Sequence, residues 1–294
     1  MDIQKRIQFA KVQTALPWLD FLAENFLLQS EESLRLRDFG ALYINQRRWF
    51  PEGGTHVQPG DLLRVHLQPR RFPLHLLTEG SAHLEESKDW ILLWKPSGLP
   101  SHETLDNILE NSKAWVEKQV SQKLWSLSRL DVGTRGWLLF AKNANFARDF
   151  HIELEQRRVQ KFYAALSPPL AESRLGLWRH WMTKSDRSPR DLSREMQNFN
   201  DLICELEILE MSQQGPWMQS RLMLLTGRTH QIRAQFAFEG APLLGDTMYG
   251  SKVCSEKSYD SFALSCERLA FQDRGHDRQF RRPANIKELS EEWL

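Results

Sequence analysis

The chain has 294 residues, 41% of them hydrophobic, and its formal net charge at pH 7 is +1. This length fits one large domain plus a small one, and the near-neutral charge argues against a protein that holds nucleic acid by bulk charge alone. No apolar run is long enough to span a membrane, and the first residues lack the apolar core of a secretory signal. The three cysteines show no Cys-x-x-Cys spacing, so we expect a reduced, cytoplasmic protein without a structural metal.

The first part of the chain, residues 1–70, predicts a small unit of its own. Apolar stripes predict helices around residues 18–22 and 33–39. After a glycine, residues 41–46 predict a short strand, and residues 57–65 predict another.

A linker is expected over residues 71–86, followed by one larger domain over residues 87–294. Within that domain three segments predict strands, namely residues 89–95, the apolar run at residues 137–142, which predicts a buried strand, and the strand-like residues 220–225. The first segment leads into Lys-Pro-Ser-Gly, in which proline and glycine indicate a turn at the end of the strand.

Two short stretches place charged residues beside these predicted strands. Ser-Arg-Leu-Asp-Val-Gly-Thr-Arg-Gly, ending at Gly136, puts Asp131 shortly before the second segment, and Gly-Arg-Thr-His-Gln-Ile-Arg, residues 227–233, follows the third. A carboxylate held out of bulk water needs an opposite charge or several hydrogen-bond donors. Arg228 and Arg233 are the candidate partners, and a purely structural ion pair beneath a sheet is the alternative.

The two stretches resemble the signature motifs of RluA-type pseudouridine synthases, which convert uridine in RNA into its carbon-linked isomer. The resemblance implies that Asp131 is the catalytic carboxylate, that Arg233 is its ion-pair partner, and that Tyr163 stacks on the flipped uracil. It also implies substrate contacts by five further residues of the two motifs: Arg129, which would fill the space left by the flipped base, and Arg228, Thr229, His230 and Gln231.

The resemblance extends from about residue 85 onward and includes a Gly-Asp-x-x-Tyr-Gly segment at residues 245–250. It implies an α+β fold with a mixed, largely antiparallel central sheet flanked by helices. The order of elements in residues 1–70 resembles a small alpha-L RNA-binding module shared with a ribosomal protein, which favours ribosomal RNA over transfer RNA as substrate. RNA contacts are expected from four arginines of that module, Arg35, Arg37, Arg47 and Arg48.

The implied reaction is redox-neutral and conserves atoms, so it requires no cofactor, and we expect a monomer that binds RNA. The chain departs from the family pattern at Ser128, where histidine is usual, at Arg135, where serine is usual, and at Ala234 and Gln235, where valine and histidine are usual. These departures bear on the RNA contacts. The alternative hypothesis is an inactive RNA-binding or ribosome-assembly factor with the same fold; a glycosidase of free nucleosides is disfavoured by the N-terminal module.

Overall fold

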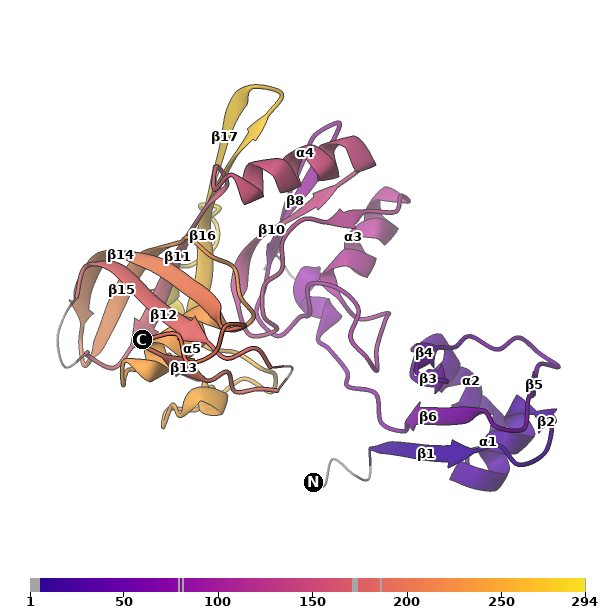
Figure 1. Cartoon of the computed structure of the whole chain (residues 1–294). Coiled ribbons are helices and arrows are strands. Elements are labelled where there is room, and N and C mark those ends of the chain that lie inside the picture. Colours follow the sequence, from indigo (N-terminus) through magenta and orange to yellow (C-terminus); the bar gives the residue numbers. More distant parts are fainter. Residues whose placement is uncertain (1–5, 79, 81, 171–173, 186, 294) are drawn as a thin grey trace. The chain divides into compact units, whose positions relative to one another are not determined.

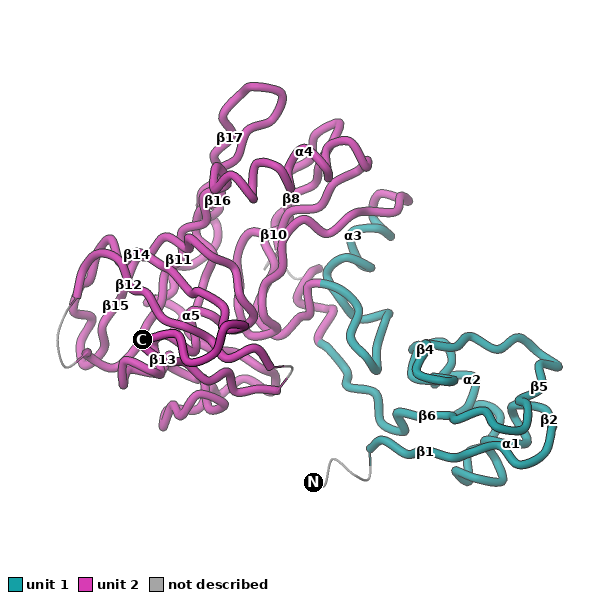
Figure 2. The backbone as a smooth tube through the Cα atoms, viewed as in Figure 1, with its two compact units in different colours: residues 1–72, 102–119 teal, residues 73–101, 120–294 magenta. Residues whose placement is uncertain are grey.

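The computed structural model describes residues 6–78, 80, 82–170, 174–185 and 187–293 (Figure 1). It divides into two compact units (Figure 2). Unit 1 comprises residues 1–72 and 102–119, and unit 2 comprises residues 73–101 and 120–294. No helix in the described part of the chain is long and apolar enough to cross a bilayer.

Unit 1 packs two helices against an antiparallel sheet with the strand order β1-β6-β3-β4. Its elements are β1 (Ile7–Lys11), β2 (Leu16–Pro17), α1 (Trp18–Phe26), α2 (Ser30–Asp38), β3 (Leu42–Ile44), β4 (Arg47–Arg48), β5 (His56–Val57) and β6 (Leu62–His66). Trp18, Phe21, Leu22 and Phe26 are the buried residues of α1, at the spacing of one helical face. The predicted helices are therefore confirmed, and the first predicted strand is confirmed as β3.

The prediction of one strand over residues 57–65 is wrong. The structure has β5 and β6 there, separated by a turn in which Gly60 has a φ of +95°. Pro59 has no N–H to donate to a sheet, and the Asp61 carboxylate accepts a hydrogen bond from the Gln58 N–H at 2.9 Å. The Pro-Gly-Asp signal therefore breaks the run.

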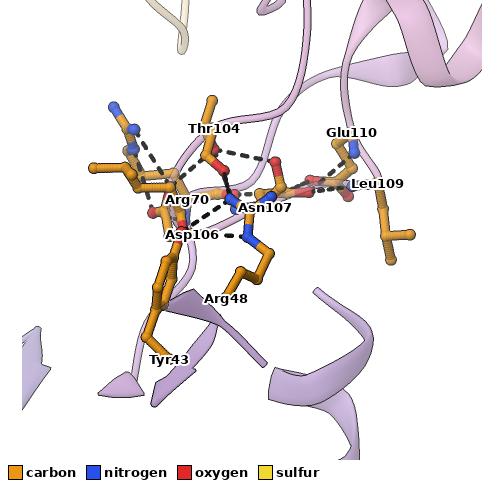
Figure 3. Close-up of polar contacts among 9 residues, drawn as sticks. Tyr43, Arg48, Arg70, Thr104, Asp106, Asn107, Leu109 and Glu110 are labelled. Atoms are coloured by element: carbon orange, nitrogen blue, oxygen red, sulfur yellow. Dashed lines mark hydrogen bonds and ion pairs between the residues drawn. The ribbon is translucent and has the colours of Figure 1, made fainter. Parts of the chain in front are cut away.

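Residues 102–119 belong to unit 1, although the sequence-based division assigns them to the larger domain. Ion pairs join them to the end of the first segment: Arg70 with Asp106 at 3.3 Å and Arg71 with Glu110 at 2.6 Å. Figure 3 shows Asp106 and Glu110 within this polar network, to which Arg70 also belongs. The sequence alone did not predict these ion pairs, because the two partners of each pair lie 36 and 39 positions apart.

Unit 2 is built on an eleven-stranded sheet with the order β13-β12-β14-β15-β11-β16-β10-β8-β7, in which β17 also pairs with β16 and β9 with β10. The strands are β7 (His83–Glu86), β8 (Trp90–Lys95), β9 (Trp125–Ser126), β10 (Arg135–Ala141), β11 (Gln160–Ser167), β12 (Gly176–Met182), β13 (Leu192–Ser193), β14 (Leu202–Gln214), β15 (Trp217–Leu224), β16 (Leu264–Asp273) and β17 (His276–Arg281). The three predicted strands are confirmed as β8, β10 and β15, and the predicted α+β class with a mixed, largely antiparallel sheet is confirmed.

The centre of this sheet is covered on both faces, since every residue of β8 and β10 is buried, and all of them except Lys95 and Arg135 are apolar. β10 and β16 are parallel, pairing Arg135 with Ser265 and Gly136 with Cys266; the other described pairs of the sheet are antiparallel. Gly136 has a φ of +120°, and a Cβ atom there would lie 2.4 Å from the Cys266 carbonyl oxygen. Only glycine allows this close approach.

The remaining helical elements are η2 (Leu74–Leu77), α3 (Ser112–Val120), α4 (Ala144–Glu155), α5 (Gln231–Phe238), η3 (Thr247–Tyr249) and α6 (Leu289–Trp293). α4 begins after Asn143, whose side chain accepts a hydrogen bond from the Phe146 N–H at 2.9 Å. α5 carries the end of the second signature motif, residues 227–233, and its residues 231–236 are buried.

Candidate active site

Asp131 lies in the segment between β9 and β10, and hydrogen bonds fix the backbone on both sides of it. Ser101 Oγ accepts from the Leu130 N–H at 2.9 Å and donates to the Leu130 carbonyl oxygen at 2.7 Å. On the other side, the Val132 carbonyl oxygen accepts from the Gly98 N–H at 2.8 Å. The backbone that carries the Asp131 carboxylate is therefore fixed before any substrate arrives.

Lys95, the last residue of β8, is fully buried beside this segment. Its amine donates to the carbonyl oxygens of Pro96 at 3.0 Å, Leu99 at 2.8 Å and Val132 at 3.2 Å. Burial lowers the pKa of Lys95 to about 7, while the negative charge of Asp131 acts to raise it. The lysine thus ties the turn after β8 to the segment that carries Asp131.

Arg233, on α5, joins two carboxylates of unequal exposure. Its Nη1 atom lies 3.3 Å from Asp131 Oδ2, and its Nε and Nη2 atoms bind the Asp246 carboxylate at 2.7 and 2.9 Å. The Asp131 side chain is 25% exposed and that of Asp246 is 1% exposed. Burial acts to lower the pKa of Arg233, but the hydrogen bonds and charge of Asp246, with the charge of Asp131, outweigh it and raise the pKa.

Apolar side chains enclose the Arg233 guanidinium. Its carbon lies 4.3 Å from the centre of the Phe262 ring and 5.0 Å from that of Tyr249, and Nη2 lies 3.7 Å from the Met248 sulfur. The rings both shield the charge from water and attract it through their faces. Asp246 and Tyr249 belong to the Gly-Asp-x-x-Tyr-Gly segment. The Gly-Asp-x-x-Tyr-Gly segment therefore holds the Arg233 guanidinium in position.

Tyr163 lies on β11 directly opposite Cys266 of β16, beside an irregularity in the pairing between Phe162 and Tyr163. The tyrosine is buried. Burial raises the pKa of Tyr163 well above its usual value, and the neighbouring Cys266 and the charge of Asp131 raise it further. The hydroxyl therefore keeps its proton at neutral pH and can donate a hydrogen bond.

The first part of the second signature motif forms the turn before α5. Arg129 Nη2 lies 3.5 Å from Thr229 Oγ1, so the two signature motifs are in contact there. The Arg228 Nε atom donates to the Ile203 carbonyl oxygen at 3.3 Å. Gln231 is buried; its side-chain oxygen accepts from the Arg228 N–H at 3.0 Å, and its amide donates to the Gln235 side chain at 3.0 Å. Gln231 therefore braces the turn, and its predicted substrate contact stays a prediction.

His230 precedes α5 in the left-handed region, with a φ of +59°. Its Nδ1 atom lies 3.3 Å from the Tyr249 hydroxyl. Burial lowers the pKa of His230, and the charge of Asp131 acts in the opposite direction. The histidine is therefore largely neutral at pH 7 and lies within the electrostatic reach of the candidate catalytic carboxylate.

The four arginines predicted to bind RNA all lie in unit 1. Arg35 and Arg37 are on α2, and Arg37 pairs with its neighbour Asp38 at 2.8 Å. Arg47 is exposed on β4. Arg48 donates to the Tyr43 hydroxyl at 3.0 Å and to the Thr104 carbonyl oxygen at 2.5 Å; Figure 3 shows its side chain reaching toward that network.

Three of the four residues that depart from the family pattern have hydrogen-bond partners for their side chains. Ser128 Oγ accepts a hydrogen bond from the Leu139 N–H at 3.1 Å. Arg135 is buried, donates to the Lys287 carbonyl oxygen at 2.9 Å and pairs with Glu292, so it fastens the segment before α6 and α6 itself to β10. Gln235 is fully buried and donates to His180 Nδ1 at 2.9 Å. None of these partners is Asp131 or Arg233.

The comparison with known proteins shows the family of the chain. The model of the RNA pseudouridylate synthase family matches residues 89–238, about half of the chain. RNA pseudouridine synthase 6, chloroplastic, of Arabidopsis thaliana is 30% identical over 227 residues, which cover 68% of this chain and 47% of that protein. The protein of the same name from Oryza sativa subsp. japonica is 28% identical over 219 residues, covering 66% of this chain and 45% of that protein.

This chain thus spans about half the length of these two relatives. Among solved structures, human RNA pseudouridylate synthase domain containing 1 superimposes with a TM-score of 0.54 at 22% identity, covering 68% of this chain and 82% of that chain. That likeness supports the fold. The chain belongs to the RluA-type family of RNA pseudouridine synthases.

Proposed function

We propose that the protein converts uridine in structured RNA into pseudouridine. The observation that carries the proposal is the Asp131 carboxylate, 25% exposed and 3.3 Å from the buried guanidinium of Arg233. The arginine favours the ionised carboxylate, which burial opposes. The partial exposure leaves that carboxylate open to a substrate, whereas an ion pair that only stabilises the fold has no need of access.

The chemistry requires the target base to leave its stack, which costs a few kcal/mol in a paired context. The bond between the sugar and N1 of uracil then breaks, the base turns, and the sugar is rejoined to C5. C5 loses a proton and N1 gains one, so the product is an isomer. In this proposal Asp131 acts in its ionised form, either as the nucleophile or as the proton acceptor at the sugar.

The other residues of the site would position the base. Tyr163 stacks on the flipped uracil and donates a hydrogen bond, in agreement with its protonated hydroxyl. Arg129 fills the space left in the RNA, while Arg228, Thr229 and His230 contact the nucleotide around it. Arg129 is well placed for this role because it already meets Thr229 at 3.5 Å.

Unit 1 would hold the RNA around the modified uridine, with Arg35, Arg37, Arg47 and Arg48 as predicted contacts. Its likeness to a ribosomal-protein module supports ribosomal RNA as the substrate in preference to transfer RNA. We further propose that the protein works as a monomer in the cytoplasm, where its free cysteines would stay reduced.

The test is a transcriptome-wide carbodiimide map of pseudouridine in a strain that lacks the gene, rescued with the wild type or with Asp131→Asn. The substitution keeps the shape of the side chain but removes its charge. We expect particular sites to vanish in the deletion strain and to return only with the wild type. Identical maps in all strains would refute the enzymatic role and favour an RNA-binding or ribosome-assembly factor with the same fold.

A further inference from the structure

The sheet of unit 1 has one face covered by helices and one row of side chains on the opposite face. Leu63 and Val65 of β6 belong to the helix-facing core. Because side chains alternate along a strand, Arg64 points the other way. Arg64 is paired with Phe9 on one side and Tyr43 on the other, and Tyr43 is paired with Arg48. We call Phe9, Arg64, Tyr43 and Arg48 the outer row.

Tyr43 holds the two arginines of the outer row in fixed positions. The Arg64 guanidinium carbon lies 3.9 Å from the centre of the Tyr43 ring, so the charge rests on the ring face. Arg48 donates to the Tyr43 hydroxyl at 3.0 Å, and that hydroxyl donates to the Leu105 carbonyl oxygen at 2.8 Å. Arginines held in this way lose little side-chain freedom when they bind a ligand.

The outer row also presents a bare aromatic ring. Phe9 is 61% exposed, whereas Tyr43, beneath Arg64, is 6% exposed. Phe9 is paired with Arg64 on the adjacent strand, about 4.8 Å away, while the Arg64 guanidinium rests on the Tyr43 ring on the other side. The Arg64 Nε atom is buried and has no hydrogen-bond partner among the described residues.

Charge in unit 1 is divided between the sheet and the helices. The strands β1, β3, β4 and β6, described throughout, carry four basic residues and no acidic one; the basic residues are Lys11, Arg47, Arg48 and Arg64. Helices α1 and α2 carry five acidic residues and two arginines. The strands of the sheet are therefore more positive than the helices. Residues 102–119 accept hydrogen bonds from the outer row through the carbonyl oxygens of Thr104 and Leu105. They also include the acidic Asp106 and Glu110, which are paired with Arg70 and Arg71.

The buried His66 on β6 reports the same local field. Burial lowers the pKa of His66, and the positive charges of Arg64, Arg48 and Arg70 lower it further, while Asp106 alone among the contributing groups raises it. His66 lies on the same face as Arg64, two residues along β6, and its ring centre is 5.6 Å from that of Tyr43. The surroundings of the outer row are thus cationic despite the one carboxylate.

We propose that the outer row binds a single-stranded segment of the same RNA that carries the target uridine, with bases stacked on Phe9 and Arg64 and phosphates near Lys11 and Arg64. This inference rests on the proposed function for the identity of the partner. Unpaired bases fit because stacking on rings and guanidinium planes requires an exposed base face. An acidic peptide would satisfy the cations but leave the Phe9 ring unmatched.

The test is fluorescence anisotropy with the full chain and a fluorescein-labelled 20-nucleotide oligouridylate, compared with a 20-base-pair RNA duplex. We expect Phe9→Ala to weaken binding of the oligouridylate by about tenfold, since one stacked base is lost. Arg64→Gln should weaken it as well and should reduce the slope of log Kd against log salt by about 0.7, the contribution of one phosphate contact. The duplex should respond much less to Phe9→Ala.

Two matched variants control for general effects. Leu27→Ala removes an apolar side chain that is 85% exposed at the end of α1, and Arg148→Gln removes an exposed arginine of α4. Both should bind the oligouridylate within twofold of the wild type. The inference is overturned if Phe9→Ala binds like the wild type, if Leu27→Ala is equally impaired, or if polyglutamate binds with the same dependence on Phe9.

Pseudouridine formation in total RNA from the deletion strain separates this inference from the proposed function. If the wild type makes no pseudouridine but oligouridylate binding still depends on Phe9 and Arg64, the binding face stands and the enzymatic proposal fails. If the wild type is active and Phe9→Ala changes neither Kd nor KM, the binding face fails and the enzymatic proposal stands.

Discussion

Replacing Arg233 with methionine separates the two carboxylates that this guanidinium joins. The change keeps much of the apolar stem and removes the charge and its hydrogen bonds to Asp131 and Asp246. The two carboxylates should respond differently because Asp131 is 25% exposed and Asp246 only 1% exposed. Asp131 can regain water, whereas Asp246 is left buried without a cation.

The magnitude follows from that difference. Removing one partner of a buried ion pair costs about 3–5 kcal/mol, because the other charge stays buried and unpaired. A partly exposed pair contributes about 0–1 kcal/mol. We therefore expect Arg233→Met to lower the free energy of unfolding by roughly 3–5 kcal/mol, most of it from Asp246.

The double variant Arg233→Met with Asp246→Leu tests this assignment. Removing both charges leaves an apolar site, and such replacements are often close to neutral. We expect the double variant to regain most of the stability lost in Arg233→Met, as measured by urea unfolding, and still to make no pseudouridine, because Asp131 lacks its cation. A full loss of activity in a stable protein would then be a loss of chemistry.

Two results would refute this reasoning. If Arg233→Met costs less than about 1 kcal/mol, the pair with Asp246 contributes no more than a surface ion pair. If the double variant is as unstable as Arg233→Met, the cost comes from lost packing against Phe262 and Tyr249 and not from the buried carboxylate.

Three further predictions concern the surroundings of the site. The pKa of Lys95 is about 7 in the folded chain and 10.5 when unperturbed, so the unfolded chain binds more protons between these two values. Relative to Lys95→Met, the stability of the wild type should therefore rise from pH 7 to 9 by on the order of 1 kcal/mol per pH unit, as urea unfolding at several pH values would show. Gly136→Ala should lower the free energy of unfolding by roughly 2–5 kcal/mol. Gly60→Ala should lower it less, because Gly60 also has a positive φ but has open space around it; equal losses in urea unfolding would exclude the clash with the Cys266 backbone as the cause. Arg135→Gln should speed proteolytic cleavage near Glu292, and unchanged cleavage would mean that other contacts hold the segment.

The sequence predicted the central strands well because their burial is continuous. The run at residues 137–141 is apolar throughout and lies in the buried strand β10. The pairing of Asp131 with Arg233, in contrast, could be predicted only from the family resemblance; residue types alone left Arg228 as an equal candidate. Arg228 instead donates to the backbone at Ile203.

Lys95 and Asp246 were missed as supporting residues for different physical reasons. The Lys-Pro-Ser-Gly segment indicated a turn, but the acceptors of the lysine are carbonyl oxygens, which any residue supplies and no sequence pattern reveals. Asp246 was visible within the Gly-Asp-x-x-Tyr-Gly segment. Its partner lies across a loop on α5, so its role required the three-dimensional arrangement.

The pairing of β10 with β16 has a consequence for the order of events during synthesis. Arg135 and its partner Ser265 lie 130 positions apart, and Glu292 is farther still. Unit 1 draws on nothing beyond residue 119, so its contacts can form while the rest of the chain is still being made. Asp131, in contrast, can pair with Arg233 only after residues 233 and 246, which form the buried ion pair, have emerged. We expect a nascent chain to engage RNA before it is able to modify it.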